Sequence, residues 1–334
     1  MPNIQIFKHI SGLIPLYFTC GSLCGAEFSR LDHHWNFVAD AVFMRRSEIN
    51  DKPIVKDSNK ERVCNDCDFA VISTKGLIQH FDFDPGFRAS VVYTEDVKNS
   101  FEAVFLWVRP WHATRHANGD RSLFFPFDSS NYAFDYYQAS KAHVECHSRF
   151  WDGELNYWRH FSPRYTDFFS LSGIMGLRYF HLNESFKLTF TKPPSTSDYS
   201  LHTENDVFGF QMGLNLQMAP TSRISWDFTA KVGAMVNRAK KRDLLQDYDN
   251  TLVLQRFNRQ KWQRGLFADM LAQVGYQFKE PFNMHAGYEL IILSGLALAP
   301  EQTSHDVGSG AGKGVYTSGY IFIHGFSLGA TFSF

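Results

Sequence analysis

Long apolar runs, an excess of one charge and abundant cysteine are all missing from this sequence. Beyond the first twenty-odd residues, the longest apolar run spans 290–299. A membrane helix needs roughly 18–20 apolar residues, so a helical membrane protein is excluded. Lys and Arg total 33 against 34 Asp and Glu, which gives no sign of the strongly basic face that a nucleic-acid partner usually requires. Neither a glycine-rich phosphate loop nor a zinc-like pair of cysteine pairs is present.

Aromatic residues are abundant instead. Phe alone occurs 33 times, and Phe, Tyr and Trp together make up 16% of the 334 residues. The hydrophobic fraction of 44% is too high for a disordered chain. A chain that is rich in aromatics but has no long apolar run leaves open a membrane protein that crosses the bilayer with strands.

The first 26 residues have the pattern of a secretory signal peptide. Lys8 precedes an apolar stretch over 10–18, and small residues follow up to Ala26, after which we expect cleavage. A buried core segment is the alternative interpretation. Export would bring the remaining chain into an oxidising compartment, where disulfides form.

Strict alternation of apolar and polar residues repeats through the second half of the chain. Over 208–217, five apolar residues alternate with five small or polar ones, and the same pattern recurs up to the terminal Phe334. Transmembrane strands need about 9–11 such residues, apolar outward and polar inward. Soluble sandwiches also alternate, but their water-facing side is normally rich in Lys, Glu and Thr. Here that side is Gly, Ser, Asn and Gln, which favours a membrane barrel.

The pattern predicts ten strands with connections of alternating length. The short connections are 95–99, 161–168, 219–221 and 279–281, and the long ones are 45–83, 110–148, 182–204, 238–263 and 294–318. We therefore expect a single all-β domain over 27–334, an antiparallel transmembrane β-barrel with short periplasmic turns and long extracellular loops. The ten strands are expected near 34–44, 84–94, 100–109, 149–160, 169–181, 205–218, 222–237, 264–278, 282–293 and 319–334.

The end of the chain resembles the assembly signal of Gram-negative outer-membrane barrels, because Phe334 closes a strand with aromatics at alternate positions. Residues 176–184 (GLRYFHLNE) and 205–213 (NDVFGFQMG) resemble a family of barrels related to the Legionella-type major outer membrane protein, also found in planctomycetes and environmental chlamydiae. This resemblance covers roughly 149–334. It implies a porin-like or surface-exposed barrel in the outer membrane of a Gram-negative bacterium, with lipid, lipopolysaccharide and the barrel-assembly machinery as partners. It supplies no catalytic residues.

Ten polar residues are expected to face the lumen: Asp40, Arg88, Asp152, Glu154, Arg178, Asp227, Lys231, Asp269, His285 and Glu289. They include six acids and three bases. In a closed barrel they would form ion pairs that fill the interior, since unpaired buried charge is costly. In an open one they would line a water-filled path that favours cations. Ten strands are close to the narrow end of barrel sizes, so we expect a narrow or loop-plugged lumen.

Two functions follow from these alternatives, a porin-like or narrow channel for small solutes and a non-conducting surface barrel whose long loops bind a partner or stabilise the envelope. An enzyme is not expected. Asp82 and Asp84, with His305 and Asp306, offer carboxylates and a His–Asp pair that would suit a rim protease. The same aspartates before Pro85 and Gly86 also fit a simple turn. We expect no cofactor and no metal.

The remaining motifs involve cysteine and basic residues. A local disulfide between Cys64 and Cys67 is favoured over free thiols, and Cys146 has no obvious partner within the chain, which suggests a disulfide to a neighbour or a buried thiol. The basic run 238–242 (RAKKR) is expected to start a long loop as a solvated rim, with contact to lipopolysaccharide as the alternative.

Overall fold

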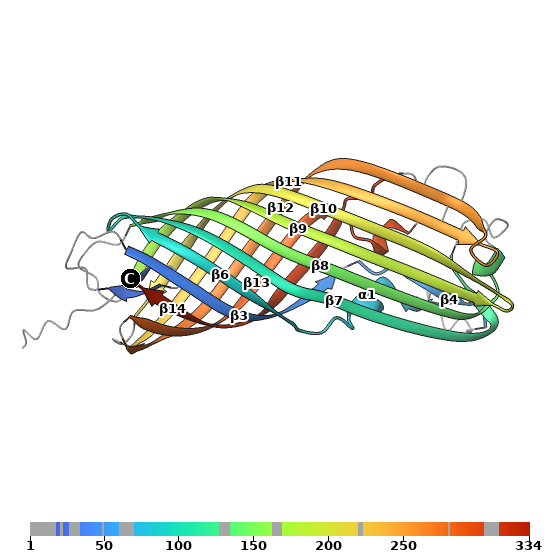
Figure 1. Ribbon diagram of the computed structural model, residues 1–334, viewed down its shortest axis with the longest axis horizontal. Helices are drawn as coiled ribbons and strands as arrows, with labels where there is room; N and C mark the ends of the chain where they lie inside the picture. Colours follow the sequence, from blue (N-terminus) through green and yellow to red (C-terminus); the bar gives the residue numbers. More distant parts are fainter. Residues whose placement is uncertain are drawn as a thin grey trace, which may run out of the picture.

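The computed structural model describes residues 18–20, 23–26, 34–48, 50–59, 70–126, 134–161, 169–219, 223–279, 281–303 and 314–334. Ten strands of this part form a closed antiparallel ring (Figure 1). The ring closes because β3 pairs with both β14 and β6, and β7 pairs with both β6 and β8. The ring strands are β3 (His34–Glu48), β6 (Asp84–Thr94), β7 (Asn99–Phe124), β8 (Ala139–His160), β9 (Phe169–Lys192), β10 (Ser195–Met218), β11 (Ile224–Asp247), β12 (Leu252–Lys279), β13 (Phe282–Leu296) and β14 (Gly319–Ser333).

Shorter elements accompany the ring. They are β1 (Phe18–Cys20) and β2 (Leu23–Ala26), which pair with each other, β4 (Pro53–Asp57), β5 (Ala70–Ser73), helix α1 (Thr74–Ile78) and the 3₁₀ turns η1 (Phe134–Tyr136) and η2 (Pro300–Gln302). Helix α1 begins where the Ser73 hydroxyl accepts a hydrogen bond from Gly76 N, a normal N-cap. Within the described residues, no helix has the length and hydrophobicity needed to cross a membrane.

The predicted all-β barrel of about ten antiparallel strands is confirmed, and the four connections predicted to be short lie at one end of the ring. The strand over 84–94 has the predicted bounds, and the strands at 169, 282 and 319 begin as predicted. The difference is length. β7 to β12 are 22–28 residues long, whereas β3, β6, β13 and β14 have 11–15.

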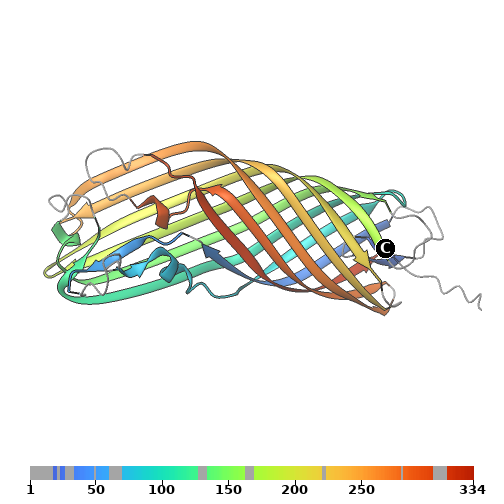
Figure 2. The same cartoon turned by 180° about the vertical axis from the view of Figure 1, so that it is seen from behind.

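Six strands therefore continue beyond the ring as a tall curved sheet (Figures 1 and 2). We call this sheet the extended wall. It comprises residues 109–124, 139–150, 180–192, 195–207, 237–247 and 252–265. The long connections predicted over 110–148, 182–204 and 238–263 are mostly strand: residues 125–138 join β7 to β8, Pro193 and Pro194 alone join β9 to β10, and residues 248–251 join β11 to β12.

The outer face of the ring is a continuous apolar belt. Exposed side chains of this belt include Phe37, Phe105, Met175, Phe210 and Phe326, each 40–56% accessible. Exposed apolar surface on this scale marks contact with a membrane or a partner. Its alternation with buried polar residues is the pattern of a transmembrane barrel.

The described parts of the two remaining long connections fold back against the concave side of the extended wall. They lie where β3, β6, β13 and β14 have ended (Figure 2). Ile54, Leu77 and Phe81 from the first, with Leu296 and Leu298 from the second, join one buried apolar core with residues of the wall. We call these segments, residues 50–59, 70–83 and 295–303, the plug.

Candidate functional site: the filled interior

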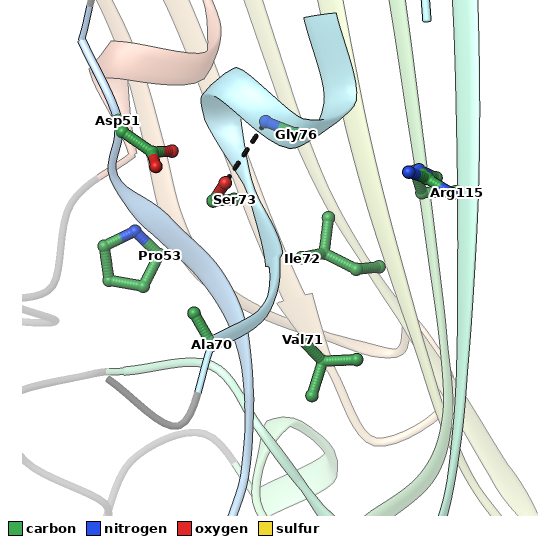
Figure 3. A pocket seen from close by; sticks show the side chains of 8 residues that line it. All are labelled: Asp51, Pro53, Ala70, Val71, Ile72, Ser73, Gly76 and Arg115. Atoms are coloured by element: carbon green, nitrogen blue, oxygen red, sulfur yellow. Dashed lines mark hydrogen bonds between the residues drawn. The ribbon is translucent and has the colours of Figure 1, made fainter. Parts of the chain in front are cut away.

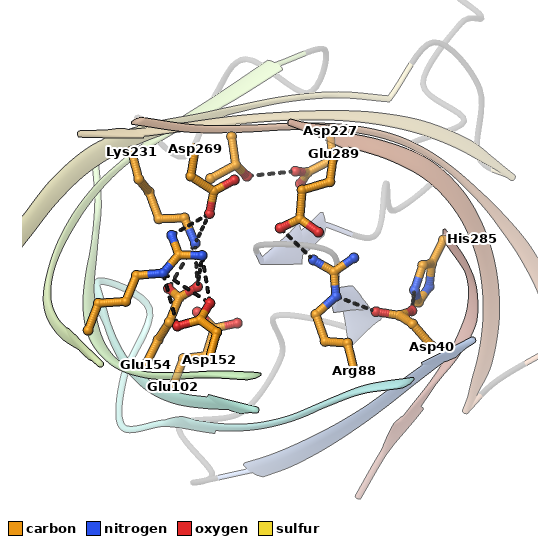
Figure 4. Close-up of polar contacts among 12 residues, drawn as sticks. Asp40, Arg88, Glu102, Asp152, Glu154, Asp227, Lys231, Asp269, His285 and Glu289 are labelled. Carbon is orange, nitrogen blue, oxygen red and sulfur yellow. Dashed lines mark hydrogen bonds and ion pairs between the residues drawn. The ribbon is translucent and has the colours of Figure 1, made fainter. Parts of the chain in front are cut away.

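The charged residues predicted for the lumen all lie on inward-facing positions of ring strands. β3 contributes Asp40, β6 Arg88, β8 Asp152 and Glu154, β9 Arg178, β11 Asp227 and Lys231, β12 Asp269, and β13 His285 and Glu289. Each is at most 9% accessible, except Lys231, whose side chain is 12% accessible. Figure 4 shows nine of them as two groups on facing walls of the ring. The tenth, Asp227, belongs to neither group and accepts hydrogen bonds from Asn215 Nδ2 (2.8 Å) and Thr229 Oγ1 (3.2 Å).

The first group surrounds Arg178 and is called the Arg178 cluster. The Arg178 guanidinium lies 2.6 Å from Asp152 Oδ2, 2.6 Å from Asp269 Oδ2 and 3.3 Å from Glu154 Oε1. Lys231 Nζ lies 2.8 Å from Glu154 Oε2 and 3.1 Å from Asp269 Oδ2. Three carboxylates and two cations, from four strands, thus neutralise most of one another's charge, as a buried network must.

The second group is the Arg88 cluster. Arg88 Nε lies 2.9 Å from Asp40 Oδ2, and its Nη1 lies 3.2 Å from Glu289 Oε1. His285 Nε2 contacts the other oxygen of Asp40. This cluster ties β3, β6 and β13 together across the point where the first and last ring strands meet.

A further acid was missed by the sequence analysis. Glu102 of β7 faces inward and accepts hydrogen bonds from Asn156 Nδ2 (3.1 Å) and Trp158 Nε1 (2.9 Å). Its inward neighbours along the strand are Val104 and Leu106, so the inward face of this strand has an apolar sequence pattern that gives no sign of a lumen. Gln211 extends the same network by donating to Glu154 Oε2 at 2.7 Å.

Directly beyond the charges the interior becomes apolar. The Arg178 guanidinium lies over the ring of Phe180 at 4.5 Å and that of Phe267 at 5.5 Å, and these two rings contact each other at 5.4 Å. From there a single buried core continues through Phe150 and Trp111 into the extended wall. The apolar core therefore begins directly beside the Arg178 cluster, and buried polar side chains such as Glu184 and Asn205 lie within it.

The plug is fixed to the wall by buried hydrogen bonds as well as by apolar contacts. Glu184 of β9 pairs with Arg46 at 2.8 Å and accepts from Ala299 N at 2.9 Å. Asn205 of β10 bonds both backbone groups of Ala297, each at 2.8 Å. Asn237 Nδ2 of β11 donates to Gly295 O at 2.9 Å. These side chains satisfy plug backbone groups that water cannot reach.

A cavity of about 320 Å³ remains between the plug and β7. Arg115 of β7 faces it from one side, and Asp51, Pro53 and Ile72 of the plug line the other (Figure 3). No residue that the sequence analysis selected lies in this cavity.

The other predicted residues are dispersed. Asp82 is exposed and Asp84 half-buried at the start of β6, whereas Cys64, Cys67, His305 and Asp306 lie outside the described residues. Cys146 is fully buried on the inner side of β8, so a disulfide to a neighbouring molecule would require it to leave the interior. Phe334 lies beside β3, where its backbone exchanges hydrogen bonds with Trp35.

The basic run 238–242 does not start a loop, and this expectation was wrong. It lies within β11, where alternation turns Arg238, Lys240 and Arg242 outward. Lys241 points inward, is 2% accessible, and pairs with Asp243 at 3.1 Å. The strand continues because the wall's inner side offers Lys241 a buried carboxylate.

Comparison with known proteins gives remote structural similarities. Neither a family model nor a curated protein matches the sequence, so the resemblance to the Legionella-type family stays a prediction. Among solved structures, the outer membrane protease OmpT of Escherichia coli aligns with a TM-score of 0.48 at 8% identity, covering 92% of this chain and 99% of that one. The toluene transporter TodX of Pseudomonas putida gives 0.33 at 10% identity, covering 92% and 90%. A FadL homologue of Pseudomonas aeruginosa gives 0.28 at 9%, covering 90% of each chain.

Proposed function

We propose that the protein is an outer-membrane barrel with a closed lumen, which acts at the cell surface through its extended wall. The observation that carries this proposal is the apolar layer around Phe180 and Phe267, backed by the plug. An ion crossing this layer would lose its hydration without polar partners, at a cost of several kcal/mol or more. The ion pairs of the Arg178 and Arg88 clusters fill the interior of the ring next to this layer, and they do not line a water-filled channel.

The belt suits the outer membrane of a Gram-negative bacterium, with the extended wall outside the cell. Arg238 and Arg264 are exposed immediately beyond the belt. Arg264 stands at a groove of about 490 Å³ lined by Phe208, Phe210 and Leu266. An acyl chain in the groove with an acidic headgroup at the arginines is the arrangement that lipopolysaccharide or another acidic lipid would adopt.

A narrow cation channel is the second candidate. The observation in its favour is the acid excess inside the ring, which Glu102 increases. The two candidates differ in one measurable property, the passage of ions through the folded barrel.

Conductance of the refolded full barrel in a planar bilayer tests this. We expect no discrete steps from protein whose folding is verified by heat-modifiable migration in detergent gels. A variant with Phe180→Ser, Phe267→Ser and Leu298→Ser should begin to conduct, with cation preference, because the apolar layer is replaced by groups that bind water. Reproducible steps from the wild type would overturn the closed barrel and make cation transport the working function.

A further inference from the structure

Four histidines gather on the outer face of the extended wall. In the antiparallel pair of β7 and β8, His112 lies directly opposite His147 and His116 directly opposite His143. Glu145 lies between the two pairs, opposite Thr114. All of these side chains face outward and are partly or fully accessible, whereas the alternate residues Ala113 and Val144 are buried in the core.

The two pairs share one geometry. Nδ1 of His112 lies 3.0 Å from Nδ1 of His147, and Nδ1 of His116 lies 3.0 Å from Nδ1 of His143. Two nitrogen ligands that bind one zinc ion at 2.0–2.1 Å are roughly 2.9–3.4 Å apart for angles between 90° and 110°. Each pair is therefore already spaced for a shared ion.

Glu145 completes the first pair. Its Oε1 accepts a hydrogen bond from His147 Nε2 at 2.9 Å. A proton on Nε2 leaves the lone pair of a neutral imidazole on Nδ1, which faces His112. Metal-binding histidines commonly donate their second N–H to a carboxylate in this way. The ligand atoms of His112, Glu145 and His147 all lie within 4.8 Å of one another, so the carboxylate is also within reach of an ion.

We propose that the outer face of β7 and β8 binds a divalent transition-metal ion such as Zn²⁺, Cu²⁺ or Ni²⁺ through His112 and His147, with Glu145 orienting His147 or serving as third ligand. Imidazole nitrogen is a preferred ligand of these ions. The His116–His143 pair forms a second, weaker site four residues along each strand, about 13 Å away.

Another grouping on the wall provides a contrast. His181, Glu204 and Asp206 are equally close to one another, but Lys240 Nζ lies 2.7 Å from Glu204 Oε1 and 3.4 Å from Asp206 Oδ2. The ammonium group already occupies the position of a cation there. Near Glu145, the facing Lys187 of β9 pairs with Asp198 at 3.0 Å.

The position on β7 suggests what a bound ion would do. Beyond Val108, β7 has lost β6 as its neighbour, and β4 pairs with it only at Leu123 and Phe124. Among the described residues, this stretch is therefore one of the two free edges of the wall, the other being the start of β12. An ion held by residues of both β7 and β8 would fasten that edge, because binding to the folded state alone adds stability.

Calorimetric titration of the folded full chain in detergent with ZnCl₂, after treatment with a chelator, tests the proposal. We expect binding that His112→Asn/His147→Asn removes at the tighter site and His116→Asn/His143→Asn removes at the weaker one. Glu145→Gln should weaken the tighter site about 10- to 100-fold. His80→Asn, which changes an exposed histidine outside both pairs, is the matched control.

A second readout separates a site from a surface that merely attracts ions. Zinc should slow hydrogen exchange of amides in 111–118 and 141–148 in the wild type, but not in the His112→Asn/His147→Asn variant. Heat-modifiable migration verifies that each variant is folded. Absence of zinc binding, or binding that both double variants retain unchanged, would overturn the proposal. The experiment does not depend on whether the lumen conducts.

Discussion

The ring and the extended wall are made from the same strands, with opposite polarity. On β9, Met175 and Leu177 point outward in the ring, whereas Phe180, Leu182 and Phe186 point inward in the wall. In the ring the outside is apolar and the inside carries the ion pairs. In the wall the outside carries histidines and charges, and the inside is mainly the apolar core, with a few buried polar pairs such as Lys241–Asp243. Lipid outside the ring and water outside the wall explain both patterns.

The change of polarity occurs at one level across neighbouring strands. On β9 it falls between Tyr179 and Phe180, and on β10 between Phe208 and Val207. The register pairs Tyr179 with Phe208 and Phe180 with Val207. On β11 the matching partners are Val236, which faces outward, and Asn237, which is buried. This shared level is where we place the outer boundary of the membrane.

The largest loss of stability is expected from a substitution inside the ring. Arg178→Met leaves Asp152, Glu154 and Asp269 with only Lys231 to compensate them. Removing one partner of a buried ion network costs about 3–5 kcal/mol, so the free energy of unfolding from lipid vesicles in urea should fall by that amount.

The control for Arg178→Met is the same change in an Asp152→Asn/Asp269→Asn background. There the cost should be clearly smaller, because amides replace two of the three carboxylates and Lys231 still pairs with Glu154. A loss below about 1 kcal/mol in the otherwise unchanged protein would mean that water solvates these carboxylates. In that case the interior of the ring would not be filled as described.

A charge introduced on the outer face should lower the free energy of unfolding more in the ring than in the wall. Met212→Arg places a guanidinium in the middle of the belt on β10, where Met212 is 54% accessible. Arginine at the bilayer midplane costs about 2–4 kcal/mol. Ser200→Arg, at an outward position of the same strand in the wall, should change the free energy of unfolding by no more than about 0.5 kcal/mol. Equal costs at the two positions would contradict the boundary placed above.

The ring could be predicted from the sequence because lipid constrains it strictly. Each strand must expose an apolar residue at every second position, so the alternation over 208–216 and the bounds of the strand over 84–94 are visible without any tertiary information. The inward positions of Asp152 and Arg178 follow from the same alternation.

The wall was missed because its pattern changes phase. Apart from Ile174, the large apolar residues of β9 occupy odd positions up to Tyr179, and from Phe180 to Phe190 they occupy even positions. A prediction based on apolar residues at one set of alternate positions therefore ends the strand where the apolar belt ends, although the strand itself continues into the wall. β7 adds a register shift between Val108 and Trp111, which moves its inward residues from even to odd positions.

Pairings within the site could not be predicted at all. Arg178 and Asp269 are 91 residues apart, and the two histidine pairs join residues 35 and 27 apart. The register of β7 and β8 brings the histidines together, and the closure of the ring brings Arg178 of β9 to Asp269 of β12, which is not a neighbouring strand. The expectation of no metal did not consider the four histidines together, since they lie in 110–148, which was predicted to be a long loop.

The smallest change in stability is expected at the tips of the wall, the end that carries η1 and the connections at 193–194 and 248–251. Asp135 in η1 accepts hydrogen bonds from the hydroxyls of Ser195 (2.5 Å) and Ser197 (2.6 Å) on β10. Burial raises the pKa of the Asp135 carboxyl, but these hydrogen bonds outweigh burial, and the pKa is lowered from its usual 3.8. Asp135→Asn should therefore reduce the local stability of the tip at neutral pH by about 1 kcal/mol, because a charged acceptor is lost.

The direction of the Asp135 pKa shift determines how the stability difference between wild type and Asp135→Asn depends on pH. A carboxyl with a lowered pKa in the folded state contributes its full stability above pH 3.8, and the contribution disappears as the pH falls through the lower folded value. Asp247 accepts hydrogen bonds from Phe134 N and Asp135 N, and its pKa is raised, chiefly by burial. Its contribution to the stability of the folded state is therefore largest at low pH and is lost as the pH rises. Hydrogen exchange of tip amides should be compared between wild type and Asp135→Asn at equal pH, and also in an Asp247→Asn background, because the Asp135 charge itself helps to raise the pKa of Asp247. The two proteins should differ at pH 6 and converge below the folded pKa of Asp135, and a difference that persists there would mean that the carboxylate's charge does not hold the tips together.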